Sequence, residues 1–239
     1  MRPGETRLGL IVPSSNTNAE PLTAAMLAGT RATALASRFP LPADLDAVID
    51  AALIGPAADL LAEAGISALA FHGTSGSWLG LEHDRALAAG LAKRVSTAAT
   101  TASLALVAAV EAVGAKKVGL VFPGPSPIAD TIAEEYAAAG IEVVSRSVPP
   151  RPMTNPEISA LPFPEISALV SAAASAAAEA IVCVGTNLRA AYLVPELEAR
   201  LGVPVVDSAA ATVWHLLGLA GAPSRLQGWG RLFETEFRQ

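Results

Sequence analysis

The sequence predicts an α/β fold of two domains that are related by a pseudo-two-fold axis and carry parallel sheets. Short apolar runs alternate with helical patterns along the chain, which is typical of parallel strands flanked by helices. Segment 117–123 repeats the pattern of segment 7–13, and the loop that begins at Gly185 repeats the loop that begins at Gly73. Because ligands bind beyond the carboxyl ends of parallel strands, we expect a ligand cleft between the domains.

The first domain begins with an apolar run over residues 7–12, which predicts a buried strand. Residues 13–17 follow as a turn, whose hydroxyl and amide groups can cap a helix over residues 19–27. A second strand is expected over residues 30–39, and Pro40 marks its end. These elements make a strand, polar loop and helix unit followed by another strand.

The middle of the first domain has a long helical pattern over residues 44–65, which Gly55 and Pro56 are expected to interrupt. A continuous apolar run over residues 66–71 predicts the third strand, and the Gly73 loop follows it. The remaining elements expected here are a helix, a short strand and an alanine-rich helix over residues 78–91, 94–97 and 101–113.

The second domain restarts the pattern at residue 115, with strands expected over residues 118–122, 180–184 and 202–206 and a last helix that ends near residue 218. Two similar segments, 155–161 and 163–169, are interpreted as a loop followed by a helix with Pro164 in its first turn. We assign residues 1–113 and the returning segment 213–239 to the first domain, and residues 114–212 to the second.

Composition excludes several classes of protein. Of 239 residues, 52% are hydrophobic, which is ample for a core, and the net charge of −6 without a basic run argues against a nucleic-acid partner. The sequence shows neither a signal-peptide pattern nor an apolar run long enough to span a membrane. One cysteine and three histidines give no internal disulfide and little material for a metal site, which fits a cytoplasmic protein. A homo-oligomer is left open.

The two repeated loops are the best candidates for a binding site. Each follows a buried strand and opens with a glycine, which lets a ligand approach the backbone, before polar side chains and a helical pattern. Backbone N–H groups in such a loop can bind a carboxylate, so two loops suit a ligand with two negative charges. The residues expected to contact it are Gly73, Thr74, Ser75, Gly185, Thr186 and Asn187.

Five short motifs occur in order along nearly the whole chain: Val-Pro-Ser-Ser-Asn-Thr at 12–17, Gly-Thr-Ser-Gly-Ser at 73–77, Thr-Asn-Leu-Arg at 186–189, Leu-Gly-Val-Pro-Val-Val at 201–206 and Gly-Arg-Leu-Phe at 230–233. Together they resemble the maleate cis-trans isomerase and arylmalonate decarboxylase branch of the Asp/Glu racemase superfamily. This resemblance implies two α/β domains, an active site in the cleft between them, a small mono- or dicarboxylate substrate, and no metal or organic cofactor.

The resemblance also implies how such a site works. A pair of cysteines, one in each repeated loop, serves as base, acid or nucleophile, and nearby N–H groups favour the thiolate. The arylmalonate decarboxylases keep only the second cysteine, and their loop hydroxyl and N–H groups stabilise the enediolate that forms when carbon dioxide leaves. Ser14, Ser15 and Asn16 match the family loop that holds a substrate carboxylate; an ordinary helix cap is the alternative role for them.

This chain departs from both patterns, because Gly73 and Gly185 occupy the two cysteine positions and Gly124 stands where the family often has a tyrosine. Cys183 lies two residues before Gly185. Residues two apart on a strand share a face, so its sulfur could point to the cleft or could be a small buried group in the core.

Three further residues are candidates for the site. His72 precedes Gly73, and an imidazole there would suit general acid/base catalysis, unless strand alternation turns it into the core. Cys183 is the second candidate for proton transfer. Arg189 could bind a carboxylate through its two N–H groups, or lie on the surface of a helix.

We carry three hypotheses from the sequence. The first is a cofactor-independent enzyme most like a maleate-type cis-trans isomerase, which the motifs at 12–17 and 186–189 favour. The second is an arylmalonate-type decarboxylase, which Gly73 in place of the first cysteine favours. The third is a non-catalytic carboxylate-binding protein on the same frame, which the loss of both cysteines favours.

Overall fold

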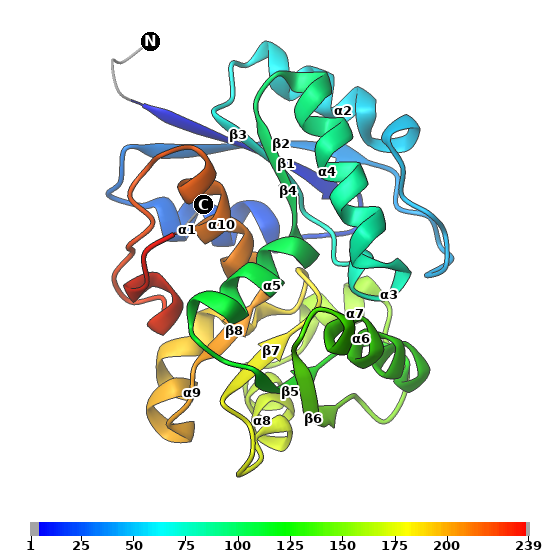
Figure 1. Ribbon diagram of the computed structural model, residues 1–239, viewed down its shortest axis with the longest axis vertical. Helices are drawn as coiled ribbons and strands as arrows, with labels where there is room; N and C mark the ends of the chain where they lie inside the picture. The colour runs from blue at the N-terminus through cyan, green and yellow to red at the C-terminus, as the bar shows by residue number, and fades with distance from the viewer. Residues whose placement is uncertain (1–4, 238–239) are drawn as a thin grey trace.

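The computed structural model describes residues 5–237 and contains two four-stranded parallel sheets (Figure 1). The strand orders are β2-β1-β3-β4 and β6-β5-β7-β8, so each half places its first and third strands at the centre of its sheet. The predicted α/β class with two parallel sheets is therefore confirmed.

The first half contains β1 (Thr6–Pro13), α1 (Ala19–Leu27), β2 (Ala32–Phe39), α2 (Ala51–Glu63), β3 (Ala68–Phe71), α3 (Gly76–Leu79), α4 (Leu81–Val95), β4 (Ala98–Thr101) and α5 (Ala102–Ala112). The second half contains β5 (Lys117–Val121), α6 (Ser126–Ala138), β6 (Glu142–Ser147), α7 (Asn155–Ala160), α8 (Phe163–Ala173), β7 (Ala180–Cys183), the 3-10 turn η1 (Arg189–Leu193), α9 (Val194–Leu201), β8 (Val205–Asp207) and α10 (Ser208–Leu219), and the 3-10 turn η2 (Arg231–Glu234) follows.

Two predicted elements of the first half were wrong. The short strand expected over residues 94–97 is instead the end of α4, which Ser96 closes in a left-handed conformation before β4 begins at Ala98. The expected break at Pro56 does not occur, because α2 begins at Ala51 and runs through the proline. The Asp50 side chain accepts hydrogen bonds from two N–H groups of the first turn, which stabilises this helix start.

Two helical regions also differ from the prediction. Gly80, with a φ of +118°, separates the expected helix over residues 78–91 into α3 and α4. The segment expected to be a loop at residues 155–161 forms its own helix, α7. Thr154 and Glu157 make a capping box at its start, and this local pattern explains the helix.

One hydrophobic core joins the two sheets. It includes apolar side chains from the central strands β1, β3, β5 and β7 and from α1, α5, α6 and α10. Helix α10 packs against α5, β3 and β4, and α5 and α10 lie between the two sheets (Figure 1). The division at residues 113/114 and 212/213 stays a prediction, and Leu232 and Phe233 of the returning tail are buried.

No helix within residues 5–237 has both the length and the apolar character needed to cross a membrane.

Candidate active site

A cavity of about 500 Å³ opens where the carboxyl ends of the strands of the two halves face each other. The loops after β1, β2, β3, β5, β6 and β7 line it, because parallel strands bring their carboxyl ends to one edge of a sheet. Nine of the residues predicted for the site lie in its wall: Ser14, Ser15, Asn16, Gly73, Thr74, Ser75, Gly185, Thr186 and Asn187.

Asn16 joins the two halves at the base of the cavity. Its Nδ2 donates to Thr186 Oγ1 at 2.9 Å, and that hydroxyl donates in turn to the His72 carbonyl oxygen at 3.1 Å. Asn16 Oδ1 accepts from the N–H groups of Asn18 and Ala19 at the start of α1. Asn16 and Thr186 are both buried, and their polar side-chain atoms are engaged within the protein. They therefore hold the two halves together, while one of the two Asn16 Nδ2 hydrogens has no acceptor among the described residues.

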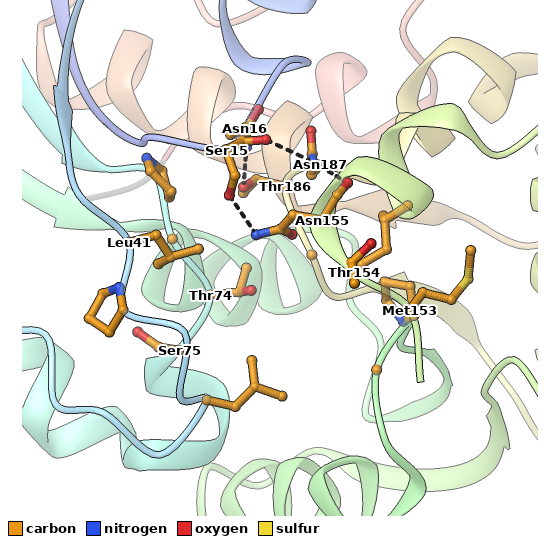
Figure 2. A pocket seen from close by; sticks show the side chains of 18 of the residues that line it. Ser15, Asn16, Leu41, Thr74, Ser75, Met153, Thr154, Asn155, Thr186 and Asn187 are labelled. Carbon is orange, nitrogen blue, oxygen red and sulfur yellow. Dashed lines mark hydrogen bonds between the residues drawn. The ribbon is translucent and has the colours of Figure 1, made fainter. Parts of the chain in front are cut away.

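Asn187 and Asn155 make a second connection between the halves, which Figure 2 shows beside Ser15. Asn187 Oδ1 accepts from the Thr17 N–H at 3.0 Å, and Asn187 Nδ2 donates to the Asn155 carbonyl oxygen at 2.9 Å. Asn155 Nδ2 donates to Ser15 Oγ at 2.9 Å. Because Ser15 Oγ accepts this bond, its own hydrogen remains available for a ligand.

The repeated loops keep backbone donors free. Within the described part of the chain, the N–H groups of residues 73–75 and 185–187 donate to no protein acceptor. The hydroxyls of Thr74 and Ser75 make no hydrogen bond to the described residues either, and Figure 2 draws both side chains at the cavity. Each loop can therefore donate several hydrogen bonds to an oxyanion.

Side chains are disfavoured at three glycines of the cavity: an aromatic ring occupies the place of a β-carbon at Gly73 and at Gly124, and the backbone conformation is unfavourable for one at Gly185. A β-carbon at Gly73 would lie 2.5 Å from Phe71 Cζ, and one at Gly124 would lie 2.4 Å from Phe122 Cε1. Gly185 has a φ of +124°, in the region that residues with a β-carbon rarely adopt. The chain is thus built around glycine at both positions where the family resemblance implies cysteine.

Large apolar side chains form much of the cavity wall, and the sequence analysis did not predict them. The Trp78 and Phe122 rings contact each other in a tilted arrangement with centroids 5.7 Å apart, and the Trp78 indole N–H donates to the Leu45 carbonyl oxygen at 2.9 Å. The apolar side chains that line the cavity are Leu41, Leu45, Ile49, Phe71, Trp78, Phe122, Met153 and Ile158. Residues 40–50 supply several of them from an irregular segment, which has no periodicity that would reveal its place.

His72 lies outside the cavity wall, so its predicted role in proton transfer does not fit the geometry. The residue is fully buried, and neither ring nitrogen has a hydrogen-bond partner among the described residues. Burial lowers the pKa of His72 to about 4, so the imidazole is neutral at pH 7. Strand alternation explains the outcome, since Gly73 faces the cavity and the residue before it faces the core.

Cys183 and Arg189 are also absent from the wall. Cys183 packs in the apolar cluster beneath α8 and α9, and burial raises the pKa of its thiol well above the usual value, with nearby Asp207 adding to the effect. Arg189 Nη2 donates to the Leu161 carbonyl oxygen at 2.6 Å, and its guanidinium lies 4.9 Å from the Phe163 ring centroid. Neither residue is placed to contact a ligand in the cavity.

Charged and reactive side chains are scarce at the cavity. Asp44, an exposed residue of the segment over residues 40–50, is the one titratable side chain among the residues of the wall that the structure describes. Among residues 5–237, no three His, Cys, Asp or Glu side chains gather as metal ligands would. The site therefore offers backbone and hydroxyl donors together with apolar surface, and little charge.

Comparison of the chain with known proteins identifies related sequences. The family model described as arylmalonate decarboxylase matches residues 8–233. The chain is 29% identical over 200 residues to an arylmalonate decarboxylase from Bordetella bronchiseptica, a match that covers 81% of each protein.

Solved structures are similar over almost the full length. A maleate isomerase variant from Pseudomonas putida with maleate has a TM-score of 0.85 and 24% identity, covering 95% of this chain and 97% of that one. An unliganded arylmalonate decarboxylase has a TM-score of 0.82 and 24% identity, covering 96% and 99%. These structures share the fold of this chain.

Proposed function

The chain belongs to the arylmalonate decarboxylase family, within the branch of the Asp/Glu racemase superfamily that also contains the maleate isomerases, and we propose that it decarboxylates a malonate with an apolar substituent. Its enzyme class is that of the isomerases and decarboxylases of this superfamily. One observation supports the proposed reaction above the others: two loops with free N–H donors and a set of large apolar side chains line the same cavity.

The comparisons favour the decarboxylase over the maleate-type isomerase that the sequence motifs favoured. Both the family model and the curated relative are arylmalonate decarboxylases. The chemistry of the cavity supports the same choice. The cysteine-dependent isomerase mechanism needs a nucleophile that adds to the double bond, and no thiol lies in the described wall of this cavity. Decarboxylation chiefly requires hydrogen-bond donors that stabilise the negative charge developing on the remaining carboxylate.

The proposed step breaks the bond between the α-carbon and one carboxylate carbon. The electron pair of that bond moves into the remaining carboxylate, which becomes an enediolate as carbon dioxide leaves. N–H groups of residues 73–75, together with the Thr74 and Ser75 hydroxyls, donate to the enediolate oxygens, and they are already in position before the charge develops. The second loop, residues 185–187, offers its N–H groups to the carboxylate that will leave.

The proton that completes the reaction comes from water in this proposal. Water protonates the α-carbon, and the hydroxide that remains combines with carbon dioxide as bicarbonate, so atoms and charge balance. His72 and Cys183, the residues first considered for this step, lie outside the cavity wall. The apolar wall contacts the substituent of the substrate, and the burial of that group contributes binding energy. No cofactor enters the step as written.

The test is incubation of the protein with methylphenylmalonate in D₂O, followed by proton NMR and chiral chromatography. We expect 2-phenylpropionate with one deuterium at the α-carbon and little enantiomeric excess, because no fixed side chain delivers the proton. Thr74→Val should lower kcat by about ten- to a hundredfold, since it removes one hydroxyl donor to the developing charge. Thr131→Val, on α6 outside the cavity wall, is the matched control and should leave kcat unchanged.

Binding without conversion would point to the carboxylate-binding protein instead. The scarcity of titratable groups in the wall is the observation that favours this second function. Stabilisation of the protein by methylphenylmalonate in a thermal shift, with no product after prolonged incubation, would support it.

A further inference from the structure

The loop after β1 is held by hydrogen bonds from one side chain of the neighbouring strand β2, that of Arg38. Pro13, Ser14 and Ser15 of this loop line the cavity. Arg38, near the end of β2, is paired in register with Val12 of β1, so its side chain starts beside the loop. The side chain is 41% exposed and lies outside the cavity wall.

The Arg38 side chain donates hydrogen bonds to backbone carbonyl oxygens of the loop after β1. Its Nη1 lies 3.2 Å from the carbonyl oxygens of Pro13 and Ser14, and it lies 2.8 Å from that of Asn16. Its Nη2 pairs with the Glu20 carboxylate in the first turn of α1. One nitrogen of the guanidinium therefore contacts three loop carbonyls with two hydrogens, so at least one hydrogen is shared between two of them, while the other terminal nitrogen holds Glu20.

These contacts also set the direction of the loop N–H groups. In a trans peptide the C=O and the N–H point in opposite directions, and no cis peptide occurs among the described residues. The N–H groups that follow Pro13 and Asn16 are those of Ser14 and Thr17, which donate to the Phe39 carbonyl and to Asn187 Oδ1. The Ser15 N–H, opposite the Ser14 carbonyl, has no acceptor among the described residues.

We infer that Arg38 is a positioning residue of the carboxylate site, which holds the Ser14–Ser15 peptide so that the Ser15 N–H donates to a bound carboxylate. This inference rests on the proposed function and adds a third donor group to the two repeated loops. The Ser15 hydroxyl strengthens the group, because Asn155 donates to its oxygen and leaves its hydrogen for the ligand.

Binding of phenylphosphonate, an unreactive dianion, tests the role of Arg38 by isothermal titration calorimetry. Arg38→Met should weaken binding by about tenfold, which corresponds to about 1.4 kcal/mol and to the loss of one oriented donor to a charged group. Arg38→Lys should give a smaller loss than Arg38→Met, because an ammonium group can still donate to loop carbonyls. In Glu20→Gln the carbonyl contacts remain, so affinity should stay within about twofold.

Arg94→Met is the matched control. Arg94 has the same 41% side-chain exposure and also pairs with a carboxylate, that of Asp59, and neither residue belongs to the cavity wall. Its replacement should leave affinity unchanged. Arg38→Met with wild-type affinity would overturn the inference, and so would equal losses in the Arg38 and Arg94 variants. If Arg38→Met does not fold, the phenylphosphonate affinity of Arg38→Lys is compared with that of Arg94→Met instead.

Amide NMR separates this inference from the proposed function. In Arg38→Met without ligand, the Ser15 amide resonance should shift and exchange faster with solvent, whereas Arg94→Met should leave it unchanged. A wild-type protein that binds neither phenylphosphonate nor methylphenylmalonate refutes the proposed function, and the Ser15 amide then still tests the orienting role of Arg38. An unchanged Ser15 amide in both Arg38 variants refutes that role.

Discussion

Gly73→Ala should destabilise the protein, because the Phe71 ring already occupies the place of a β-carbon at residue 73. The new β-carbon would lie 2.5 Å from Phe71 Cζ and 2.9 Å from Cε1, well inside ordinary van der Waals contact. Phe71 is buried and packs against Phe39 with ring centroids 5.7 Å apart, so it has little room to move. Overpacking of this kind costs about 1–3 kcal/mol of the free energy of unfolding.

Phe71→Leu provides the second half of a double-mutant cycle. Leucine lacks the distal ring atoms that meet the new β-carbon, so Gly73→Ala should cost close to nothing in that background. The two changes should therefore show a coupling free energy of about 1–3 kcal/mol. The destabilisation caused by the cavity that Phe71→Leu leaves is present on both sides of the cycle and cancels. Urea denaturation followed by tryptophan fluorescence measures all four free energies of unfolding.

Gly90→Ala is the control for replacing a glycine by alanine. A β-carbon at Gly90 in α4 has no heavy atom within 4 Å, so the change should stabilise the helix by about 0.5–1 kcal/mol. The steric argument fails if Gly73→Ala costs the same in both Phe71 backgrounds. Confirmation would show that the Phe71 ring is what disfavours a side chain at residue 73.

Three further predictions follow from the same structure. Gly185→Ala should cost about 1–3 kcal/mol by urea denaturation, because alanine is strained at a φ of +124°, and a cost no larger than that of an exposed loop substitution would contradict this. Burial lowers the pKa values of His72 and His215 to about 4. The unfolded chain therefore binds their protons first as pH falls from about 6.5 to about 5, which costs about 3 kcal/mol for the two histidines together. Burial raises the pKa of Asp207 to about 7, which stabilises the fold by about 2 kcal/mol over the same interval, so the protein should lose about 1 kcal/mol in total. Asp207→Asn should lose about 3 kcal/mol, and equal losses in the two proteins would refute the assignment.

Sequence reasoning predicted the parts of the site that depend on local pattern. The Gly-Thr steps after two buried strands predicted the loops at residues 73–75 and 185–187, because the carboxyl ends of parallel strands meet at one edge. The predictions failed where a shift of one residue along a strand changes the face of the sheet toward which a side chain points. His72 precedes the glycine and points away from the cavity. For Cys183, the rule that residues two apart share a face ends at Gly185, where the backbone leaves the strand with a positive φ.

The apolar wall could not be predicted for a different reason. Leu41, Leu45 and Ile49 lie in an irregular segment, where neither a period of two nor one of 3.6 marks the side that faces the cavity. Their position depends on contacts with distant residues, such as the bond from the Trp78 indole to the Leu45 carbonyl. The expected strand over residues 94–97 failed because Ser96 ends α4 in the left-handed region, a conformation that serine seldom adopts.

Turnover of methylphenylmalonate by the wild-type protein, compared with turnover of maleate, tests the central claim most directly. We expect release of carbon dioxide with formation of 2-phenylpropionate, loss of most of this activity in Thr74→Val, and no conversion of maleate to fumarate. Formation of fumarate, or a methylphenylmalonate solution that remains unchanged, would contradict the claim that this cavity is a decarboxylase site.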